Sequence, residues 1–396
     1  MGKNKLSECI AQAIIDAHVS VCTHVPGYGG TETFEAYRKL LGKKIPCSFH
    51  EEVAYTLSHG AGLVGNRSAC LIKTHGFAKA TNSIISSLSA GTLGGVVLFA
   101  FDDEDGSHSD NIFKAEGFIQ GSEIPYDRLK LENPYEQILR SYEKSESIGL
   151  PVALIVNTSQ IHKECKFERR EIDWKPRPFK SQPELNVVCP PMSRFQREIF
   201  EAKISGNLEW NKISSPTPLQ VPQGLPSPLK ETALSYVPIF DAFKSVIQGS
   251  NENSVSVSGD AGTSSLFAFS PYHCIDFCTY MGGSTSLAVG AFLAGFRKTW
   301  AVTGDFSFIS AGHLGLLEAF HQKIPIKLLI LNNKKASATG NQEIDPRLLE
   351  AVLKPYEKYV ISINAFGNAK DSFDKIRQAF VTAHESSSLA IVVAEV

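Results

Sequence analysis

Short apolar runs alternate with amphipathic helical patterns in both halves of this chain. Helical patterns over 52–64, 284–297 and 310–321 each lie between two such runs. The runs that predict buried strands span residues 21–25, 69–73, 96–101 and 152–156 in the first half and 254–257, 299–303, 327–331 and 390–393 in the second. Alternation of this kind predicts parallel sheets covered by helices on both faces. We therefore expect an α/β fold with two doubly wound parallel-sheet domains.

A proline-rich segment separates the two halves. Residues 163–230 hold half of the chain's 20 prolines. Proline removes a backbone donor and fixes φ, which disfavours regular elements. We expect a long, largely extended linker here, interrupted by a short helix over 193–202. The predicted organisation is a first domain over 1–162, a linker over 163–230 and a second domain over 231–396.

Composition excludes several classes of protein. The formal net charge of −2 gives no reason to expect nucleic acid or an acidic membrane surface as a partner. No apolar run approaches the roughly 18 residues of a membrane span, and the first residues lack the pattern of a signal peptide. The 8 cysteines are scattered, without a C-x-x-C pair. We therefore expect a cytoplasmic protein with free thiols.

Polar residues follow two of the predicted strands in the second half. Gly304-Asp305-Phe306-Ser307 follows 299–303, and Asn332-Asn333 follows 327–331. Glycine permits a tight turn, and N–H groups at the start of the next helix can face a phosphate. Asp305 and an Asn beside it would supply the oxygen ligands that Mg²⁺ prefers. The sequence therefore predicts a diphosphate and metal site, with a plain helix cap at Asp305 as the alternative.

These residues resemble the motif of the thiamine-diphosphate-dependent enzymes, a Gly-Asp-Gly-type turn followed farther along by Asn-Asn. The stretch after Asn333 is similar to that of phosphonopyruvate and sulfopyruvate decarboxylases and of indolepyruvate ferredoxin oxidoreductases, although Phe306 stands where the motif often has Gly. The resemblance implies thiamine diphosphate and Mg²⁺ as cofactors. It also implies that the first domain binds the pyrimidine and the second the diphosphate. The implied metal ligands are Asp305, Asn333 and the carbonyl of Lys335.

The resemblance assigns further residues to the cofactor site. Met281 would be the wedge beneath the bent cofactor, although a lone Met is more often core filler. The turn around Asp260, taken alone, is equally consistent with a structural role. By position in the motifs, the cofactor-binding residues are Gly27, Gly76, Asn82, Asp260, Gly262, Thr263, Thr279, Met281, Gly304, Phe306 and Ser307.

A catalytic carboxylate is expected in the first domain. Thiamine chemistry needs a carboxylate at the pyrimidine ring, where its hydrogen bond favours the imino form that removes the thiazolium proton. Glu51 follows a short apolar strand and opens a helix, as the family's catalytic Glu does. Its neighbour Glu52 remains an alternative, and so does a role for either residue in stabilising the helix N-terminus.

Histidines and a tyrosine are the candidates for substrate contact. Tyr28, His75 and His108 are expected to line the substrate pocket, with His75 also as a catalytic acid. A structural role is the alternative for each histidine, as it is for those at 24, 50 and 313. The acidic run over 102–105 is expected to be a solvated loop that could cover the site. Lysines at 73, 79 and 335 could recognise a second anionic group on the substrate or be solvated surface residues.

The predicted function is non-oxidative decarboxylation of a 2-oxo acid through ylide and enamine intermediates. Carboligation or another C–C transfer, and a non-catalytic thiamine-binding protein, are the alternatives. The linker is too short for a third doubly wound domain, and the scattered cysteines could not hold an iron–sulfur cluster. Both points favour the compact decarboxylases over the oxidoreductases. The resemblance also implies a homodimer or homotetramer with active sites at the subunit interface.

Overall fold

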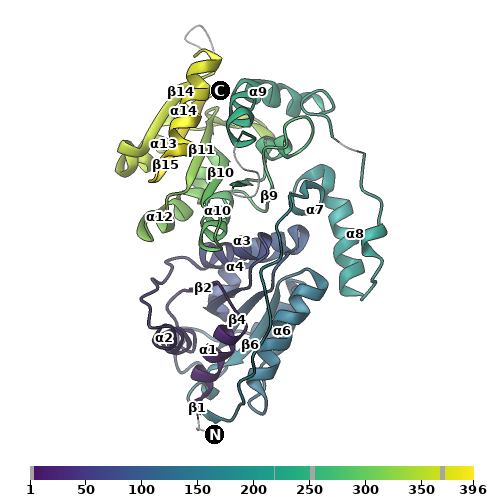
Figure 1. Ribbon diagram of the computed structural model, residues 1–396, viewed down its shortest axis with the longest axis vertical. Helices are drawn as coiled ribbons and strands as arrows, with labels where there is room; N and C mark the ends of the chain where they lie inside the picture. The colour runs from purple at the N-terminus through teal and green to yellow at the C-terminus, as the bar shows by residue number, and fades with distance from the viewer. Residues whose placement is uncertain (1–3, 218, 250–254, 366–370) are drawn as a thin grey trace. The chain divides into compact units, whose positions relative to one another are not determined.

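The computed structural model describes residues 4–217, 219–249, 255–365 and 371–396. The chain divides into two compact units. Unit 1 comprises Met1–Lys180 and Phe200–Leu208, and unit 2 comprises Ser181–Ile199 and Glu209–Val396. In Figure 1 the helices and strands of unit 1 run from purple to blue, and most of unit 2 runs from green to yellow.

Unit 1 is built on a five-stranded parallel sheet with the order β2-β3-β4-β6-β5. Its strands are β2 (Val21–His24), β3 (Ser68–Lys73), β4 (Val96–Asp102), β5 (Tyr126–Arg128) and β6 (Val152–Asn157). The central strands are buried along nearly their whole length, as expected for a sheet covered on both faces. Because the strands are parallel, their last residues share one edge, which therefore carries His24, Lys73 and Asp102.

Six helices cover this sheet: α1 (Leu6–Asp16), α2 (Gly30–Leu41), α3 (Glu51–Leu63), α4 (Thr74–Ala90), α5 (Ala115–Gly121) and α6 (Pro134–Ile148). One face packs against α1, α2 and α6, with Phe34 and Tyr142 fully buried in its core. The other face packs against α3, α4 and α5, with Tyr55 and Phe77 fully buried. A short antiparallel pair, β1 (Asn4–Lys5) with β7 (Glu164–Cys165), completes the unit.

Unit 2 has a six-stranded parallel sheet with the order β14-β15-β11-β10-β8-β9. One face forms a core with the helices α9 and α14 around the fully buried Trp300. Helices α10 and α12 pack together outside that core. The strands are β8 (Val255–Gly259), β9 (Phe277–Cys278), β10 (Lys298–Gly304), β11 (Lys327–Asn332), β14 (Val360–Asn364) and β15 (Ala390–Glu395). The helices are α9 (Ser227–Ile247), α10 (Ser284–Leu293), α11 (Asp305–Ser307), α12 (His313–His321), α13 (Pro346–Leu353) and α14 (Phe373–Glu385). The predicted fold class, α/β with parallel sheets, is confirmed.

Small differences separate the predicted elements from the observed ones. The helix expected over 284–297 ends at Leu293, because Gly295 adopts a left-handed conformation with φ 112°. The helix expected over 310–321 begins as a π-helical turn, Phe308–Gly312, before α12. The start of the strand expected over 254–257, Ser254, lies outside the described residues.

The segment 163–230 is divided between the two units and is not uniformly extended. It contains the helices α7 (Pro183–Asn186) and α8 (Ser193–Ile204), the second of which covers the helix expected over 193–202. Its first part is fastened to unit 1 through Trp174 and Arg177. The domain boundaries at 162 and 230 stay predictions.

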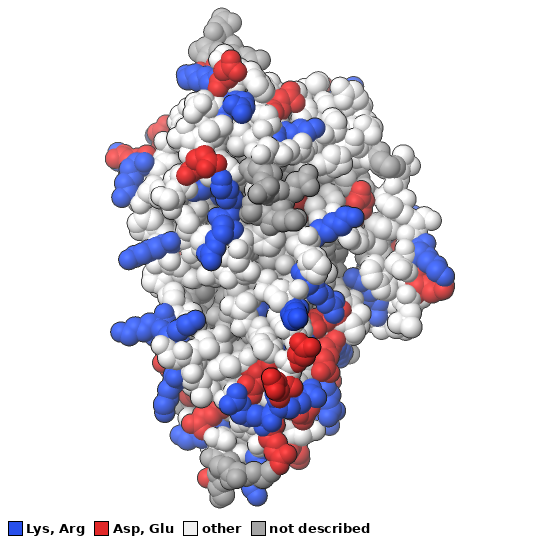
Figure 2. All heavy atoms as spheres, in the orientation of Figure 1, with Lys and Arg blue, Asp and Glu red and all other residues white. Residues whose placement is uncertain are grey.

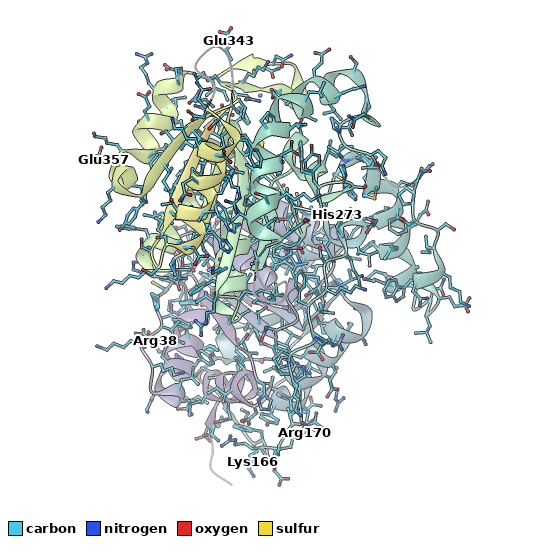
Figure 3. The ribbon with its side chains drawn as sticks, turned by 45° about the horizontal axis from the view of Figure 1, so that its top comes forward. Arg38, Lys166, Arg170, His273, Glu343 and Glu357 are labelled. Carbon is cyan, nitrogen blue, oxygen red and sulfur yellow. The ribbon has the colours of Figure 1, made fainter. Side chains whose placement is uncertain are left out.

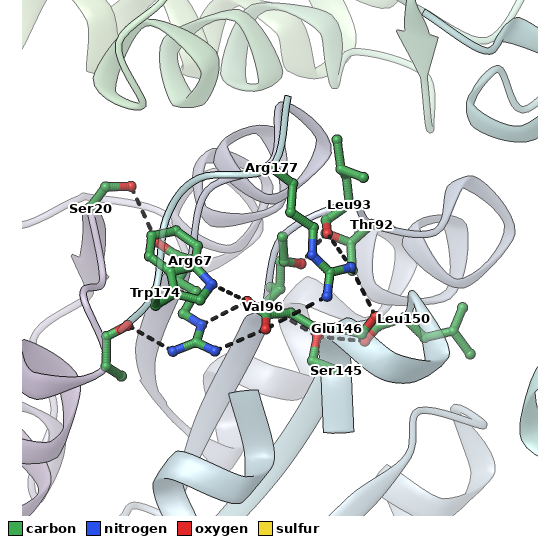
Figure 4. A network of polar contacts seen from close by, with 12 residues as sticks. Ser20, Arg67, Thr92, Leu93, Val96, Ser145, Glu146, Leu150, Trp174 and Arg177 are labelled. Atoms are coloured by element: carbon green, nitrogen blue, oxygen red, sulfur yellow. Dashed lines mark hydrogen bonds and ion pairs between the residues drawn. The ribbon is translucent and has the colours of Figure 1, made fainter. Parts of the chain in front are cut away.

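The contacts of Trp174 and Arg177 converge on Glu146 (Figure 4). Arg67 binds both carboxylate oxygens of Glu146, at 2.7 and 2.9 Å, and the Trp174 Nε1 donates to Glu146 Oε1 at 2.9 Å. The Arg177 guanidinium donates to the backbone carbonyls of Leu93 and Glu146 at 3.3 and 3.2 Å. The side chains of Arg67 and Glu146 are only 5% and 8% exposed, so this is a buried ion pair.

Glu146→Ala should lower the free energy of unfolding of unit 1 by about 3–5 kcal/mol, because it leaves the Arg67 charge buried without its partner. Chemical denaturation followed by circular dichroism measures the change. Glu143→Ala is the matched control on the same helix: its carboxylate is 58% exposed and pairs with Arg170 at 3.3 Å. An exposed pair contributes about 1 kcal/mol or less. Equal effects of the two substitutions would contradict the structural role of Glu146.

Charged side chains of both signs are interspersed over the face drawn in Figure 2. Figure 3 shows Arg170 of unit 1 and Glu357 of unit 2 extending outward. Glu357 is paired with Lys354 at 2.8 Å. Exposed pairs of this kind contribute little to stability. None of the described helices combines the length and apolar character needed to cross a membrane.

Candidate functional site

The Gly-Asp turn of unit 2 joins the carboxyl ends of two neighbouring strands. Strand β10 ends at Gly304 and pairs in parallel with β11, which ends at Asn332. Asp305 is 2% exposed, and its two carboxylate oxygens accept the N–H groups of Phe306 at 2.8 Å and Lys334 at 2.6 Å. The carboxylate therefore holds the turns after both strands together.

The environment of Asp305 fits a divalent cation. Burial raises the pKa of the Asp305 carboxyl to about 6, although backbone N–H groups lower it in part. A buried carboxylate of this kind is favoured by a cation beside it. Asn333 lies on the turn after β11, next to the Lys334 N–H that Asp305 accepts: its Nδ2 donates to Tyr236 Oη at 3.0 Å and its Oδ1 accepts the Lys335 N–H at 3.2 Å. Carboxylate, amide and carbonyl oxygens are the ligands expected for Mg²⁺.

Two glycines beside this turn face open space. A Cβ atom built on Gly304 or on Gly262 would meet no atom of the described residues within 4 Å, apart from the two neighbours in the chain. Thr279 is buried, and its Oγ1 has no hydrogen-bond partner in the described part of the chain. Free hydroxyl groups and glycine turns of this kind suit the oxygen atoms of a diphosphate. Thr263, buried at the start of the 3₁₀ helix Thr263–Ala268, follows the Gly262 turn.

Asp260 contacts protein groups on two other elements. It is 1% exposed, its Oδ1 accepts the Ser284 N–H at 2.7 Å, and Thr303 Oγ1 donates to its Oδ2. Burial raises the pKa of Asp260 to about 6, with these hydrogen bonds opposing the rise. Asp260 therefore holds the start of α10 against the end of β10, and its predicted contact with the cofactor stays a prediction.

Two apolar side chains of the predicted cofactor set are exposed. Met281 is 41% exposed and Phe306 is 42% exposed, while Ser307 is 8% exposed. Because the side chains of Met281 and Phe306 touch solvent, they do not serve as core filler. The wedge role of Met281 and the cofactor contact of Phe306 stay predictions.

Glu51 of unit 1 opens α3 and lies directly against Gly76. A Cβ atom at Gly76 would approach Glu51 Cγ to 2.6 Å, so a side chain there would displace the carboxylate. Glu51 Oε2 lies 2.9 Å from Lys79 Nζ. Glu52 points to a different partner, Asn82, whose Nδ2 donates to Glu52 Oε1 at 3.0 Å. The two glutamates therefore have distinct surroundings: Glu51 lies against Gly76 and Lys79, and Glu52 binds Asn82.

The acidic run after β4 is not the solvated loop that the sequence predicted. Asp102 and Asp103 are 6% and 5% exposed. Asp103 Oδ2 accepts the His108 N–H at 2.8 Å and the Ser109 hydroxyl at 2.7 Å, so it organises the loop from within. Only Glu104 and Asp105 of the run are exposed. Asp103 is buried because the loop folds back over the end of β4.

The predicted substrate residues gather around this loop. The rings of Tyr28 and His108 stack with centroids 3.7 Å apart. His75 Nε2 lies 2.7 Å from Asn111 Oδ1, and its Nδ1 is buried without a hydrogen-bond partner in the described residues. The Phe113 ring meets His75 edge-on at 5.0 Å. A separate pocket of about 550 Å³ is lined by residues 112–117 with Asp102, Glu104 and Arg128.

Several other residues named as possible substrate contacts have partners within the protein. His24 is buried, with Nδ1 2.9 Å from the Leu71 carbonyl and Nε2 3.2 Å from Thr31 Oγ1, and burial lowers its pKa. His313 Nδ1 lies 3.2 Å from the Phe308 carbonyl. His50 is the residue before α3. Lys73 is held by the 103–111 loop and is therefore not free for a substrate anion.

Metal binding by cysteine finds no support in the part of the chain that the structure describes. All eight cysteines are free, and only Cys47 is not fully buried. No three His, Cys, Asp or Glu side chains among the described residues gather into a metal-binding group. An ion at Asp305 would therefore complete its coordination with amide, carbonyl and ligand oxygens.

Comparison with known families shows which kind of domain the residues around Asp305 resemble. Residues 254–393 match the family described as thiamine pyrophosphate enzyme, C-terminal TPP binding domain. This part of the chain is similar to the thiamine-binding domain of that family. The predicted resemblance is confirmed, and Gly304, Asp305 and Asn333 all lie within the matched residues.

Curated relatives match this chain over part of their length. The indolepyruvate oxidoreductase subunit IorA of Methanothermobacter marburgensis is 27% identical over 221 residues, which are 52% of this chain and 35% of the relative. The subunit of the same name from Thermococcus kodakarensis is 26% identical over 162 residues, 39% of this chain and 25% of the relative. This chain thus matches about a third or less of the length of these relatives.

A solved thiamine enzyme shares the fold along nearly the whole chain. The thiamine diphosphate-dependent 4-hydroxybenzoylformate decarboxylase of Rhodococcus jostii RHA1 superposes with a TM-score of 0.64, at 13% identity, and 99% of each chain is covered. The thiamine-enzyme architecture therefore extends over both units, including unit 1, which the family match does not reach.

Sequence reasoning missed the structural partners of several residues around the candidate site. Lys79, expected as a substrate contact or a surface residue, pairs with Glu51, Tyr236 binds Asn333, and Asp103, expected in a solvated loop, holds the loop of His108. The signal for Asp103 was present as an acidic residue directly after a buried strand, where carboxyl-edge ligands are expected. The partners of Lys79 and Tyr236 had no such signal, because they are remote in the sequence.

Proposed function

We propose that this chain is a thiamine-diphosphate- and Mg²⁺-dependent enzyme that decarboxylates a 2-oxo acid without oxidation. The observation that carries the proposal is the buried Asp305, which lies on the same pair of turns as Asn333 inside a thiamine-binding domain. A buried carboxylate beside amide and carbonyl oxygens is suited to a hard cation that also binds a diphosphate.

Unit 2 would hold the diphosphate end of the cofactor. Asp305, Asn333 and the carbonyl of Lys335 would bind Mg²⁺, and the open turns at Gly262 and Gly304 leave room for the phosphates. Thr279 Oγ1 would donate to a phosphate oxygen, which would satisfy its buried hydroxyl. Thiamine diphosphate, when bound, supplies a carbon nucleophile and accepts the electrons that CO₂ leaves behind.

Unit 1 would supply the acid–base groups. Glu51 would hold a proton at a pyrimidine ring nitrogen, and Gly76 leaves the space in which its side chain lies. His75 is suited to protonate the product, because one ring nitrogen is fixed by Asn111 and the other lacks a partner in the described residues. Tyr28 and His108 would contact the substrate.

Decarboxylation is favoured over the other reactions that thiamine supports. The cysteines of the described chain are dispersed and mostly buried, so an oxidative reaction that needs an iron–sulfur cluster on these residues is disfavoured. Both Glu51 and Asp305 are present, which argues against a non-catalytic protein. Carboligation differs only in the acceptor that reaches the pocket. We also propose a cytoplasmic homodimer or homotetramer with active sites between subunits.

Purified protein with Mg²⁺ and thiamine diphosphate should release CO₂ from at least one 2-oxo acid of a panel with aliphatic, aromatic and anionic side chains. Each reaction is repeated once without cofactor and once with cofactor and an added aldehyde. Free aldehyde product supports decarboxylation, whereas a 2-hydroxyketone formed only with the added aldehyde supports carboligation. If the cofactor binds and no 2-oxo acid loses CO₂ under either condition, the proposed reaction is wrong.

A further inference from the structure

Lys73 is the last residue of β3, and its side chain crosses to the loop that follows β4. Its Nζ donates to the His108 carbonyl at 2.6 Å and to Ser109 Oγ at 2.7 Å, and it lies 3.8 Å from Asp103 Oδ2. We propose that Lys73 and Asp103 form a clamp that holds residues 103–111 and keeps His108 stacked on Tyr28. Both are then positioning residues for the reaction, an assignment that rests on the proposed function.

The clamp is a closed network. Asp103 Oδ2 accepts the His108 N–H at 2.8 Å and the Ser109 hydroxyl at 2.7 Å. Lys73 donates to the carbonyl of the same His108 and to the oxygen of the same Ser109. The Asp103 carboxylate therefore accepts hydrogen bonds from His108 and Ser109, and the Lys73 ammonium group donates hydrogen bonds to the same two residues. Thr158 Oγ1, 3.3 Å from Asp103 Oδ1, anchors the carboxylate from the end of β6.

Burial makes this network different from a surface ion pair. The side chain of Asp103 is 2% exposed and that of Lys73 is 16% exposed. Burial acts to raise the pKa of Asp103, but the hydrogen bonds from Ser109 and His108 and the charge of Lys73 bring it below its usual value. Asp103 is therefore ionised at neutral pH. Charge-assisted hydrogen bonds in such surroundings are about twice as strong as neutral ones.

The glycine before Tyr28 leaves space for the side chain of Lys73. A Cβ atom at Gly27 would lie 2.7 Å from Lys73 Cγ and 2.9 Å from its Cδ. The lysine stem thus runs over the Gly27 turn, and the lysine head holds the loop of His108. Tyr28 and His108 stack with centroids 3.7 Å apart because both of their loops are fixed by the same side chain.

Positioning of this kind matters because the two rings lie on loops and not on rigid strands. His108 is exposed, and Tyr28 is half-buried with one side packed against the core of unit 1, so the His108 ring in particular depends on contacts from its loop. A displacement of about 1 Å at a reacting group can cost about 10²-fold in rate. Groups on loops need supporting contacts to stay within the productive geometry. The clamp supplies these contacts without touching the cofactor-binding residues of unit 2.

Hydrogen–deuterium exchange of the cofactor-free protein tests the clamp directly. In Lys73→Met and in Asp103→Asn, amides of residues 105–111 should exchange about 10–100-fold faster, as expected for the loss of charge-assisted hydrogen bonds. Gly27→Ala should act in the same direction by pushing the lysine stem aside. Lys114→Met and Gly117→Ala are the controls: Lys114 is exposed, and a Cβ at Gly117 has no atom within 4 Å. Unchanged exchange of 105–111 in both clamp variants, with β3 and β4 amides still protected, overturns the clamp.

Kinetics with the wild-type substrate then test the positioning role. Lys73→Met should lower kcat/KM by about 10–100-fold, while calorimetry shows an unchanged affinity for thiamine diphosphate with Mg²⁺. Faster loop exchange with unchanged kcat/KM overturns the role in the reaction. The exchange experiment needs no cofactor, so it judges the clamp even if the wild-type protein shows no thiamine-dependent turnover. Absence of thiamine-dependent turnover in the wild-type protein would overturn the proposed function but not the clamp.

Discussion

Glu51→Gln is expected to slow proton–deuterium exchange at the thiazolium carbon of bound thiamine diphosphate by about 10²–10⁴-fold. Glutamine keeps the shape of the side chain beside Gly76 but cannot hold a proton at the pyrimidine nitrogen. The exchange is followed by NMR after quenching, in the absence of substrate. Cofactor affinity should change little, because Mg²⁺ and the diphosphate are expected to be held by unit 2.

Glu52→Gln is the matched control for this prediction. Adjacent helix positions point about 100° apart, and Glu52 is bonded to Asn82 at 3.0 Å. Burial raises the pKa of Glu52, with Asn82 opposing the rise, so Glu52 also has a perturbed carboxyl without lying against Gly76. Slow exchange in Glu52→Gln with wild-type exchange in Glu51→Gln would identify Glu52 as the catalytic residue. Unchanged exchange in both variants would contradict thiamine activation by this helix.

Asp305→Ala should reduce Mg²⁺-dependent binding of thiamine diphosphate by about 100-fold or more, since even residues that only support a metal ligand are worth 10–100-fold. Asp305 is the only charged ligand proposed for the ion, and it also holds the turns after β10 and β11 together. Isothermal calorimetry with and without Mg²⁺ measures the change. Asp345→Ala, which removes an exposed helix-capping carboxylate of the same unit, serves as the control. Equal affinity of Asp305→Ala and wild type would remove the metal from this site.

Mixing the two inactive variants tests whether the site is shared between subunits. If Glu51 of one subunit and Asp305 of its neighbour act together, a hybrid dimer of Glu51→Gln and Asp305→Ala has one intact site. Random reassociation at equal concentrations should then recover about a quarter of wild-type activity, since half of the dimers are hybrids with one of two sites intact. No recovery after proven subunit exchange would place both groups of each site on one subunit.

Parts of the fold and of the candidate site could be predicted because their signals are local. The helix predicted over 52–64 is observed as Glu51–Leu63, and the strand predicted over 299–303 as Lys298–Gly304. Apolar periodicity and turn residues are properties of a few consecutive positions, so the ends of these elements can be inferred from the sequence. Asp305 and Asn333 could be brought together in the same way, because parallel strands place their carboxyl ends at one edge.

The linker and the acidic run show where local reasoning stops. Ten prolines in 163–230 predict an extended path but not where that path binds, which depends on Arg67 and Glu146, 79 residues apart. Asp103 and Glu104 are adjacent acids, yet Asp103 is buried and Glu104 is exposed. Composition cannot separate the two residues, because their burial is decided by the path of the loop after β4.

The sequence by itself determined the α/β architecture, the position of the thiamine motif and the identity of Asp305, Asn333 and Glu51 as candidates. Only the tertiary structure decided which side chains meet across the sheet edge: Lys73 with His108, 35 residues away, and Lys79 with Glu51. The physical reason is that burial and turn propensity act on neighbouring residues. Polar contacts between separate elements depend instead on strand order and backbone path, which no short stretch of sequence specifies.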